Sequence, residues 1–575
     1  MSQQSKLTTT QRFWRLLKPD RKEITNVYVY SIFNGLINLS LPLGIQAIIN
    51  LIQGGRVSTS WMILVMFVVL GVAITGVLQI YQLRITENLQ QKIFSRSAFE
   101  FAYRIPKIRM EALYRHYAPE LMNRFFDTIS VQKGLSKILI DFSSAALQVT
   151  FGLILLSLYH PFFILFGLVL VMLVYAIFRF TGKRGLQTSL EESKFKYKVA
   201  HWLEELARTH TTFKLAGKSD LPLQHTDKHV GDYLQARESH FKVLVQQYSL
   251  MVVFKVLVAT GLLAIGGILV MNQQMNIGQF VAAEIIILMV MASVEKLILS
   301  LETIYDVLTS LEKIGQVTDL ELEATHGTDL GLHSQNAGLE VQMDTVSFTY
   351  PGAQKKTLNE FSIHIREGEK WLISGPNGSG KSTLLFVLAG LYRVQEGSLM
   401  YNGISKASLH PDSLRSVIGD CLSQELLFEG TLLDNIAMGK EEVTFDDVKW
   451  AVRHLRLEKF ISSLPEGYDT MLDPQGKRFP RSVIQKLLLA RAIADKPKLL
   501  LLEDVFEHIE ETERREIFDF LTSSENAWTM VAVSSDPYIA SRCDTIGLIQ
   551  DGQMIRTGTY DEMKSIVNFK TKGHA

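Results

Sequence analysis

The sequence has few cysteines and no excess of charge of either sign. Its 575 residues include two cysteines, Cys421 and Cys543, and neither belongs to a Cys-x-x-Cys or Cys/His spacing. Isolated thiols of this kind predict neither a structural zinc site nor a disulfide framework. Lysine and arginine together number 59, as do aspartate and glutamate. A neutral chain gives no electrostatic reason to expect a nucleic-acid partner, so we exclude that class.

The N-terminus also lacks the features of a removable signal peptide. Residues 1–23 are polar and basic, with no apolar core and no small-residue cleavage site behind them. What the chain does have is length and apolar residues, since 47% are hydrophobic and nearly all long apolar runs lie before about residue 300. One hydrophobic core seldom organises so long a chain. We therefore expect a multidomain protein.

Six apolar stretches in the first half are each long enough to cross a bilayer, which takes about 20 residues in a helix. The second and fourth are nearly uninterrupted, whereas the other four contain scattered polar or charged residues. Together they predict a six-helix α transmembrane bundle. The stretches are 27–52, 61–83, 138–159, 161–182, 248–271 and 277–300.

Charges in the connecting loops predict how the bundle is oriented. The loops after the second and fourth stretches are long and rich in lysine and arginine, whereas the other three are short and hold Arg56 as their single basic residue. Because basic residues gather in cytoplasmic loops, the long loops and both termini should face the cytoplasm. We expect an integral, multi-pass protein of the bacterial inner membrane, with the lipid bilayer as a partner.

Ionisable residues within the spans can be interpreted in two ways. Asp141, Lys255 and Glu284 line a substrate path if their side chains face the protein interior or water. Alternatively, they pair with one another or extend towards the interface, which is the interpretation we favour for Glu295 and Lys296 near the cytoplasmic end. No substrate follows from these residues.

After 324–329 the pattern changes to short apolar strands alternating with turns and helices. We place the boundary here, with a transmembrane domain over 1–324 and a nucleotide-binding domain over 325–575. In the second domain an apolar strand runs into a glycine-rich loop and then an apolar helix, which is the setting of a P-loop. Residues 375–382 match G-x-x-x-x-G-K-[ST] in full. The sequence therefore predicts binding of ATP or GTP with Mg²⁺.

The P-loop assigns roles to particular residues. Backbone N–H groups of the loop and the helix N-terminus approach the phosphates, Lys381 reaches the β- and γ-phosphates, and Ser382 binds Mg²⁺. The expected phosphate-binding residues are Gly375, Pro376, Asn377, Gly378, Ser379, Gly380, Lys381, Ser382 and Thr383.

The whole chain, six spans followed by one cassette, resembles an ATP-binding cassette (ABC) exporter half-transporter. The resemblance implies an α transmembrane bundle joined to an α/β P-loop NTPase domain. It implies that Tyr350, in SFTYPG, stacks on adenine, and that Gln424 links Mg²⁺ and the attacking water to the membrane domain. The segments 116–127 and 208–220 resemble the cytoplasmic loops that dock on the cassette and transmit its movement.

The signature motif of this family, Leu-Ser-Gly-Gly-Gln, aligns with residues 479–483, which read Phe-Pro-Arg-Ser-Val. In the family, its hydroxyl and N–H groups bind the γ-phosphate of the ATP held by the opposite subunit. Pro480 supplies neither group, and Arg481 adds bulk where the backbone should approach closely. We hypothesise that Ser482 donates a hydrogen bond instead and that Arg481 offers charge.

The two acids that follow the strand 498–502 are exchanged relative to the family. Glu503 stands at the position of an aspartate and can still meet Mg²⁺ through water. Asp504 stands at the position of the glutamate that polarises the attacking water, and a misplacement of about 1 Å can cost about 100-fold in rate. Ser535 replaces a γ-phosphate histidine, and His508 lies in a nearby loop and is not its substitute.

We therefore expect catalytic roles for Lys381, Gln424, Glu503 and Asp504, with weakened hydrolysis. Metal contacts are expected from Ser382, Gln424 and Glu503. The alternative, that the two acids only end a strand, stays open.

Two function classes remain. The first is an ATP-hydrolysing exporter subunit that dimerises with itself or with another half-transporter. The second is a hydrolysis-deficient, nucleotide-gated membrane protein in which ATP binding is regulatory. The first span, with LPLGIQAIINLIQGG, resembles the peptide and protein secretion branch, for which a periplasmic adaptor would be a further partner. No leader-peptidase domain is expected, because the first span begins by about residue 27.

Overall fold

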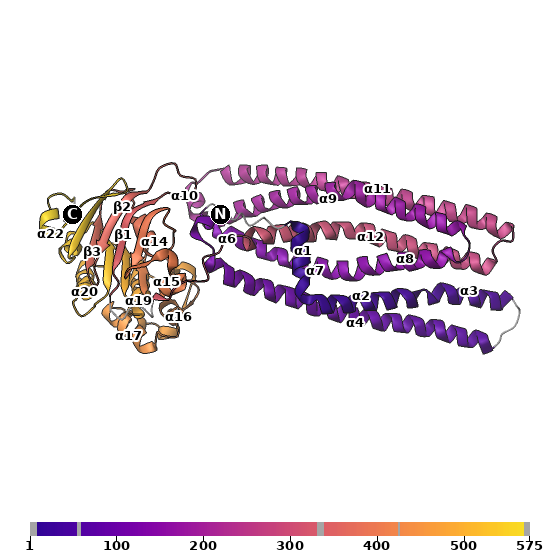
Figure 1. Ribbon diagram of the computed structural model, residues 1–575, viewed down its shortest axis with the longest axis horizontal. Helices are drawn as coiled ribbons and strands as arrows, with labels where there is room; N and C mark the ends of the chain where they lie inside the picture. Colours follow the sequence, from indigo (N-terminus) through magenta and orange to yellow (C-terminus); the bar gives the residue numbers. More distant parts are fainter. Residues whose placement is uncertain (1–7, 54–58, 115, 331–337, 424–425, 568–575) are drawn as a thin grey trace. The chain divides into compact units, whose positions relative to one another are not determined.

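The computed structural model describes residues 8–53, 59–114, 116–330, 338–423 and 426–567. The chain folds into two compact units (Figure 1). The membrane unit comprises Met1–Pro106 and His116–Leu320, and the cassette unit comprises Lys107–Arg115 and Glu321–Ala575. The membrane unit thus ends four residues before the expected boundary at residue 324, and a short internal segment of the first half belongs to the cassette.

Six helical stretches of the described residues are long and apolar enough to cross a membrane, which confirms the predicted six-helix bundle. They extend well beyond a bilayer. The 51 residues of α11 (Leu221–Met271) measure about 77 Å at 1.5 Å per residue, more than twice the ~30 Å of a hydrocarbon core. The stretches are Thr9–Gln53, Thr59–Lys107, Ala118–Ser157, Phe162–Arg208, Leu221–Met271 and Ile277–Thr318.

The helical elements of this unit include α1 (Thr9–Leu17), η1 (Lys18–Asp20), α2 (Arg21–Asn38), α3 (Ser40–Gln53), α4 (Thr59–Arg104), α6 (Ala118–Met122), η3 (Asn123–Phe126), α7 (Asp127–Lys137), η4 (Ile138–Phe142), α8 (Ser143–Ser157), α9 (Phe162–Arg208), α10 (His210–Leu215), α11 and α12 (Ile277–Thr318). The first span is divided between α2 and α3. Pro42 lies in the first turn of α3, where its missing N–H leaves no hydrogen bond unmade.

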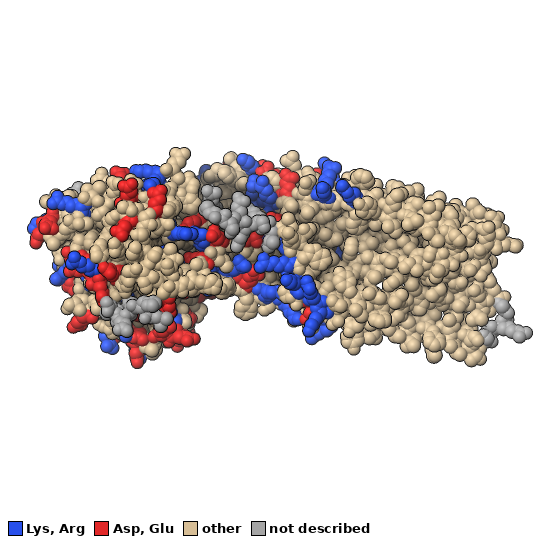
Figure 2. Space-filling model, viewed as in Figure 1, with Lys and Arg blue, Asp and Glu red and all other residues tan. Residues whose placement is uncertain are grey.

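The last span, α12, forms the centre of the membrane unit. Half of its most apolar window is buried, compared with 6% for the window in α4. Figure 1 shows α12 running between the α9–α11 pair and the α2–α4 pair. The outer helices leave their apolar side chains exposed, and Figure 2 shows an uncharged surface over one part of this unit with charged residues gathered at the other. This distribution suits a bundle that faces lipid.

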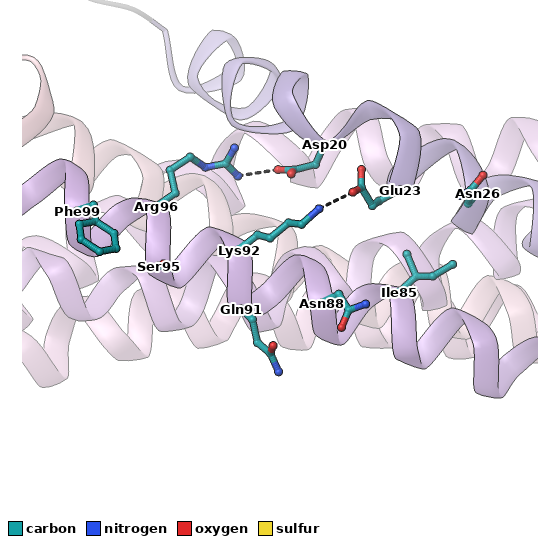
Figure 3. A pocket seen from close by; sticks show the side chains of 10 residues that line it. All are labelled: Asp20, Glu23, Asn26, Ile85, Asn88, Gln91, Lys92, Ser95, Arg96 and Phe99. Carbon is teal, nitrogen blue, oxygen red and sulfur yellow. Dashed lines mark hydrogen bonds and ion pairs between the residues drawn. The ribbon is translucent and has the colours of Figure 1, made fainter.

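Ion pairs join helices both beside and within the spans. Lys92 and Arg96 of α4 reach across a cavity of about 780 Å³ to Glu23 at 2.5 Å and Asp20 at 2.6 Å (Figure 3). These pairs tie α4 to the start of the first span.

Further into the bundle, Lys255 pairs with Glu295 at 2.6 Å, and Lys296 pairs with Asp141 at 3.2 Å. The pairing interpretation therefore holds for these four residues. Glu284 forms no ion pair with the described residues.

The cassette unit contains a six-stranded sheet in the order β12-β11-β3-β10-β9-β6, parallel except at β12. Strands β3, β9 and β10 are buried along their whole length, as expected for a parallel sheet covered on both faces. The strands are β3 (Lys370–Ser374), β6 (Ile418–Cys421), β9 (Leu499–Glu503), β10 (Thr529–Val533), β11 (Thr545–Gln550) and β12 (Gln553–Gly558). This sheet confirms the α/β class predicted for the second domain.

A second, antiparallel sheet has the order β2-β1-β4-β5. Its strands are β1 (Val341–Phe348), β2 (Leu358–Ile365), β4 (Glu396–Tyr401) and β5 (Ile404–Ser405), and β7 (Gly430–Thr431) pairs with β8 (Met471–Leu472). The helices are α14 (Lys381–Leu388), α15 (Pro411–Ser416), α16 (Leu432–Ala437), α17 (Phe445–His454), α18 (Glu458–Ser462), α19 (Arg481–Ala494), α20 (Glu511–Thr522), α21 (Pro537–Ser541) and α22 (Tyr560–Met563).

The segment Lys107–Arg115 packs with the cassette although it lies between the second and third spans. Ile108 forms an antiparallel bridge with Leu322, and Met110 packs against the core around β1 and α14. The segment 116–127, for which the resemblance implies a docking role, belongs to the membrane unit, and its docking stays a prediction. Pro106 lies where the long helix of the second span ends, and the chain leaves the helix there to form the segment Lys107–Arg115.

The half-buried pair between α11 and α12 yields a stability prediction. We expect Lys255→Met to lower the free energy of unfolding by about 2 kcal/mol, because Glu295 is left as an unpaired charge within a span. The double variant Lys255→Met/Glu295→Met should lose less than the single variant. Thermal unfolding in detergent measures both.

A matched control is Lys242→Met, which removes an exposed pair with Glu238 on the same helix. Its loss should stay within about 0.5 kcal/mol. Equal losses for the single and double variants at 255 and 295 would contradict the prediction.

Candidate functional site

The loop between β3 and α14 has the backbone geometry of a phosphate-binding loop. Gly375, Gly378 and Gly380 have φ values of 152°, 79° and 107°, and Gly380 is the N-cap residue of α14. A Cβ atom on Gly375 would lie 2.1 Å from the carbonyl oxygen of Ile549, so only glycine fits there. The loop therefore closes tightly beneath the N-terminus of α14, where backbone N–H groups favour an anion.

A cavity of about 310 Å³ lies above this loop. It brings together the loop, the first turn of α14 and the ends of β9 and β10, because the carboxyl ends of parallel strands share one edge of a sheet. The lining residues are Thr357, Asn377, Gly378, Gly380, Lys381, Ser382, Thr383, Glu503, Asp504 and Val533.

Lys381 lies inside the loop, where its Nζ donates hydrogen bonds to the carbonyl oxygens of Gly375 and Pro376, both at 2.9 Å. Burial lowers the pKa of Lys381, and the nearby carboxylates of Asp504 and Glu503 oppose that shift. The ammonium group is therefore held close to both acids, at a position suited to neutralising phosphate charge.

Ser379 supplies a second sign of a phosphate site. Its hydroxyl oxygen is buried and makes no hydrogen bond with any described residue. Buried polar atoms are normally paired, and a hydroxyl in this loop is a suitable donor to a phosphate oxygen. The loop therefore fits the anion that the sequence motif predicts.

Glu503 and Asp504 occupy different environments at the end of β9. Glu503 is 6% exposed and accepts a hydrogen bond from the N–H of Ser423 at 3.0 Å. Asp504 has a φ of 47°, which aspartate tolerates better than most residues, and its N–H donates to the carbonyl of Val533 at 3.1 Å. This turn leaves both acids lining the cavity.

The residues present fit Mg²⁺. No group of three or more His, Cys, Asp or Glu side chains in the described part of the chain could hold a metal ion. Mg²⁺ in nucleotide sites does not need one, because it takes one or two carboxylates together with phosphate and water oxygens. The Ser382 hydroxyl and the Glu503 carboxylate line the same cavity and would supply the protein ligands.

Tyr350 lies beside this cavity, two residues after the end of β1. Its hydroxyl forms a hydrogen bond with the Thr383 hydroxyl at 3.0 Å, and burial raises the pKa of its phenol group. Its ring stacks against Tyr114, with centroids 5.1 Å apart and ring planes at 22°. No sequence signal pointed to Tyr114, because it lies in the first half of the chain and belongs to no local motif.

The signature-like segment is separate from the cavity. Pro480 is the N-cap residue of α19, which begins at Arg481, and no side chain caps this helix. Arg481 is exposed and Ser482 is half-buried, and neither lines the cavity.

The remaining predicted positions are dispersed. Ser535 is exposed, and the N–H of His508 donates to the Gln485 side chain at 3.3 Å. Gln424 lies outside the described residues.

Two family comparisons cover most of the chain. Residues 358–507 match the family described as ABC transporter, and residues 24–294 match the family described as ABC transporter transmembrane region. A putative multidrug export ATP-binding/permease protein of Bacillus subtilis is 23% identical, with 96% of each chain covered.

Other relatives match the cassette alone. ABC multidrug transporter mdr4 of Aspergillus fumigatus is 32% identical over 247 residues, which are 42% of this chain and 18% of that protein. The chain thus spans less than a fifth of the length of this relative. Among solved structures, a bacterial Atm1-family ABC exporter with ATP bound shares the fold, with a TM-score of 0.79, 17% identity, and coverage of 95% and 96%.

The loop geometry gives a prediction for Gly375. Gly375→Ala should weaken ATP binding at least tenfold, because the added Cβ would meet the Ile549 carbonyl oxygen and displace the loop. Binding of a fluorescent ATP analogue to the purified protein measures the effect.

The matched control is Gly403→Ala, at a cassette glycine with a φ of 74° and no atom within 4 Å of the added Cβ. It carries the cost of positive φ, about 1–2 kcal/mol, without the clash. ATP affinity should be unchanged in this variant. A similar loss of affinity in both variants would show that the close approach at Gly375 is unimportant.

Proposed function

We propose that this chain is an ABC exporter half-transporter, with its transmembrane and cassette domains in one polypeptide, and that it hydrolyses ATP to ADP and phosphate to drive export. One observation carries this proposal. The cavity of about 310 Å³ contains the phosphate-binding loop and two strand-end acids together. A site for binding alone could use Glu503 as a ligand of Mg²⁺ but would not need the second acid, Asp504.

Each residue of the cavity has a task in this proposal. The loop N–H groups and the Ser379 hydroxyl bind phosphate oxygens, and Lys381 turns from the loop carbonyls to the β- and γ-phosphates. Ser382 and Glu503 would hold Mg²⁺, which neutralises charge on the phosphate oxygens. Asp504 orients the attacking water and accepts its proton.

The same geometry supports slow turnover. An aspartate at position 504 is one methylene shorter than glutamate, and a misplacement of about 1 Å can reduce the rate about 100-fold. The positive φ of Asp504 sets the direction of a short side chain, which cannot extend further into the cavity. Hydrolysis is therefore the weakest step of the proposed cycle.

A second candidate function is nucleotide-gated regulation, in which ATP binding closes the protein and turnover is incidental. The observation that favours it is Pro480. This N-cap residue of α19 has neither a hydroxyl nor an N–H, so position 480 offers no donor to an ATP on the opposite subunit. Ser482 and Arg481 are the proposed substitutes, through one hydrogen bond and one positive charge.

The partners and cargo belong to the same proposal. The chain acts as a dimer, with itself or with another half-transporter, in a bacterial inner membrane with the cassette in the cytoplasm. The first span supports a peptide or protein cargo, handed to a periplasmic adaptor. The matched relatives named as multidrug transporters support a small hydrophobic molecule as the alternative cargo.

Lengthening one acid tests the catalytic assignment. Asp504→Glu should raise the ATPase rate of the purified protein about tenfold or more, because the carboxylate gains the reach that the proposed water needs. Asp504→Asn should abolish turnover while ATP affinity is kept. The control is Asp551→Glu, an exposed acid of the cassette paired with Lys355, which should leave the rate unchanged.

Phosphate release by the unaltered protein separates the two functions, and Lys381→Ala is its negative control. Under the hydrolytic proposal this substitution removes both ATP binding and phosphate release from the full chain in lipid nanodiscs. Tight ATP binding by the unaltered protein, with no phosphate release before or after Asp504→Glu, would instead establish the regulatory function.

A further inference from the structure

An aromatic cluster of the cassette unit surrounds Tyr350 on several sides. Phe348 and Tyr392 approach its ring at 5.0 Å and 5.4 Å between centroids, with ring planes at 83° and 86°. Phe348 and Tyr392 also contact each other at 5.1 Å, and both are buried. Tyr114 differs from these two, because its ring lies nearly parallel to that of Tyr350 and is 50% exposed.

Tyr350 itself is held in place. The hydrogen bond between its hydroxyl and the Thr383 hydroxyl fixes the ring against α14, the helix that begins at the phosphate-binding loop. Phe348 and Tyr392 support the ring from the buried core. The parallel face that a flat base could use is therefore the one that Tyr114 now covers.

Tyr114 is attached at the end of a small, well-anchored helix. Its own N–H donates to the carbonyl of Met110, which closes α5 (Met110–Leu113). The Glu111 carboxylate accepts a hydrogen bond from the N–H of Arg393 at 2.8 Å, and Ile108 bridges to Leu322. These bonds hold the segment Lys107–Arg115 on the cassette, whereas the Tyr114 ring is secured only by stacking among the contacts described.

We propose that Tyr114 covers the face of Tyr350 on which the purine of ATP stacks, so that the base binds by displacing the Tyr114 ring. This inference rests on the proposed function, because it requires that ATP occupies the cavity. Tyr114 then sets how much the base, as distinct from the phosphates, adds to affinity. The stacking of two aromatic side chains contributes less free energy than the stacking of a base on an aromatic side chain. ATP therefore displaces Tyr114, but it binds less tightly than it would if Tyr114 were absent.

Displacement of Tyr114 also links binding of the base to the membrane-spanning half of the chain. The segment that carries Tyr114 follows directly after the helix of the second span and precedes α6 of the third. Binding of the base would therefore move a side chain that belongs to the connection between the second and third spans. Among the contacts described, the Tyr114 ring touches the site through Tyr350, so we expect phosphate binding alone to leave it in place.

The test compares two ligands on the full-length protein in nanodiscs. ATP carries a base, whereas tripolyphosphate offers the same phosphates without one. We expect Tyr114→Ala to lower the dissociation constant for ATP by between about twofold and tenfold, which is the worth of one aromatic pair. Its dissociation constant for tripolyphosphate should not change, and Tyr114→Phe, which keeps the stack, should match the unaltered protein.

A double-variant cycle completes the test. Tyr350→Ala should weaken ATP binding by removing the base platform, and adding Tyr114→Ala to it should then have no further effect. Weaker ATP binding in Tyr114→Ala, with tripolyphosphate unaffected, would show that the base lies between the two rings and would overturn displacement. Equal changes for both ligands would also overturn it, because they would place the effect in the phosphate loop.

The outcome distinguishes this inference from the proposed function. Failure of the unaltered protein to bind ATP would overturn both. Binding of ATP with an unchanged dissociation constant in Tyr114→Ala would overturn the role of Tyr114 alone.

Discussion

The nucleotide site depends on one tight backbone contact at the end of a buried strand. Where β3 ends, Gly375 brings the chain so close to the Ile549 carbonyl that no side chain fits between them. That contact allows the following residues to pass beneath the start of α14, where the free N–H groups of the first helical turn favour an anion. The positions of Lys381, Ser382 and the buried Ser379 hydroxyl all follow from it.

The parallel sheet supplies the other half of the site. Strands β3, β9 and β10 are buried throughout and run side by side, so their carboxyl ends meet at one edge. Glu503 and Asp504 therefore reach the loop from a strand that lies far from it in the sequence. The two side chains differ by one methylene, and the N–H of Asp504 is fixed by its hydrogen bond to the Val533 carbonyl. For that reason, adding one methylene to the side chain at position 504 tests directly whether its length limits hydrolysis.

The membrane unit obeys a different constraint, since its surroundings supply no hydrogen-bond partners. Its six apolar stretches satisfy their backbones as helices, and charges within them are tolerated where they pair, as Lys255 does with Glu295. The central helix α12 buries a large apolar surface, while the outer helices expose theirs. Apolar side chains thus form the buried core around α12, and the same residue types form the lipid-facing surface of the outer helices.

The sequence by itself determined the six spans, the change to an α/β domain and the phosphate-binding loop. These features follow from local patterns, because helix length, strand burial and glycine spacing are all written in consecutive residues. The tertiary structure decided the pairing of Asp141 with Lys296, the allocation of Lys107–Arg115 to the cassette, and the stacking of Tyr114 on Tyr350. Contacts of this kind join residues that are distant in the chain, and only the packing of whole helices and strands brings them within reach.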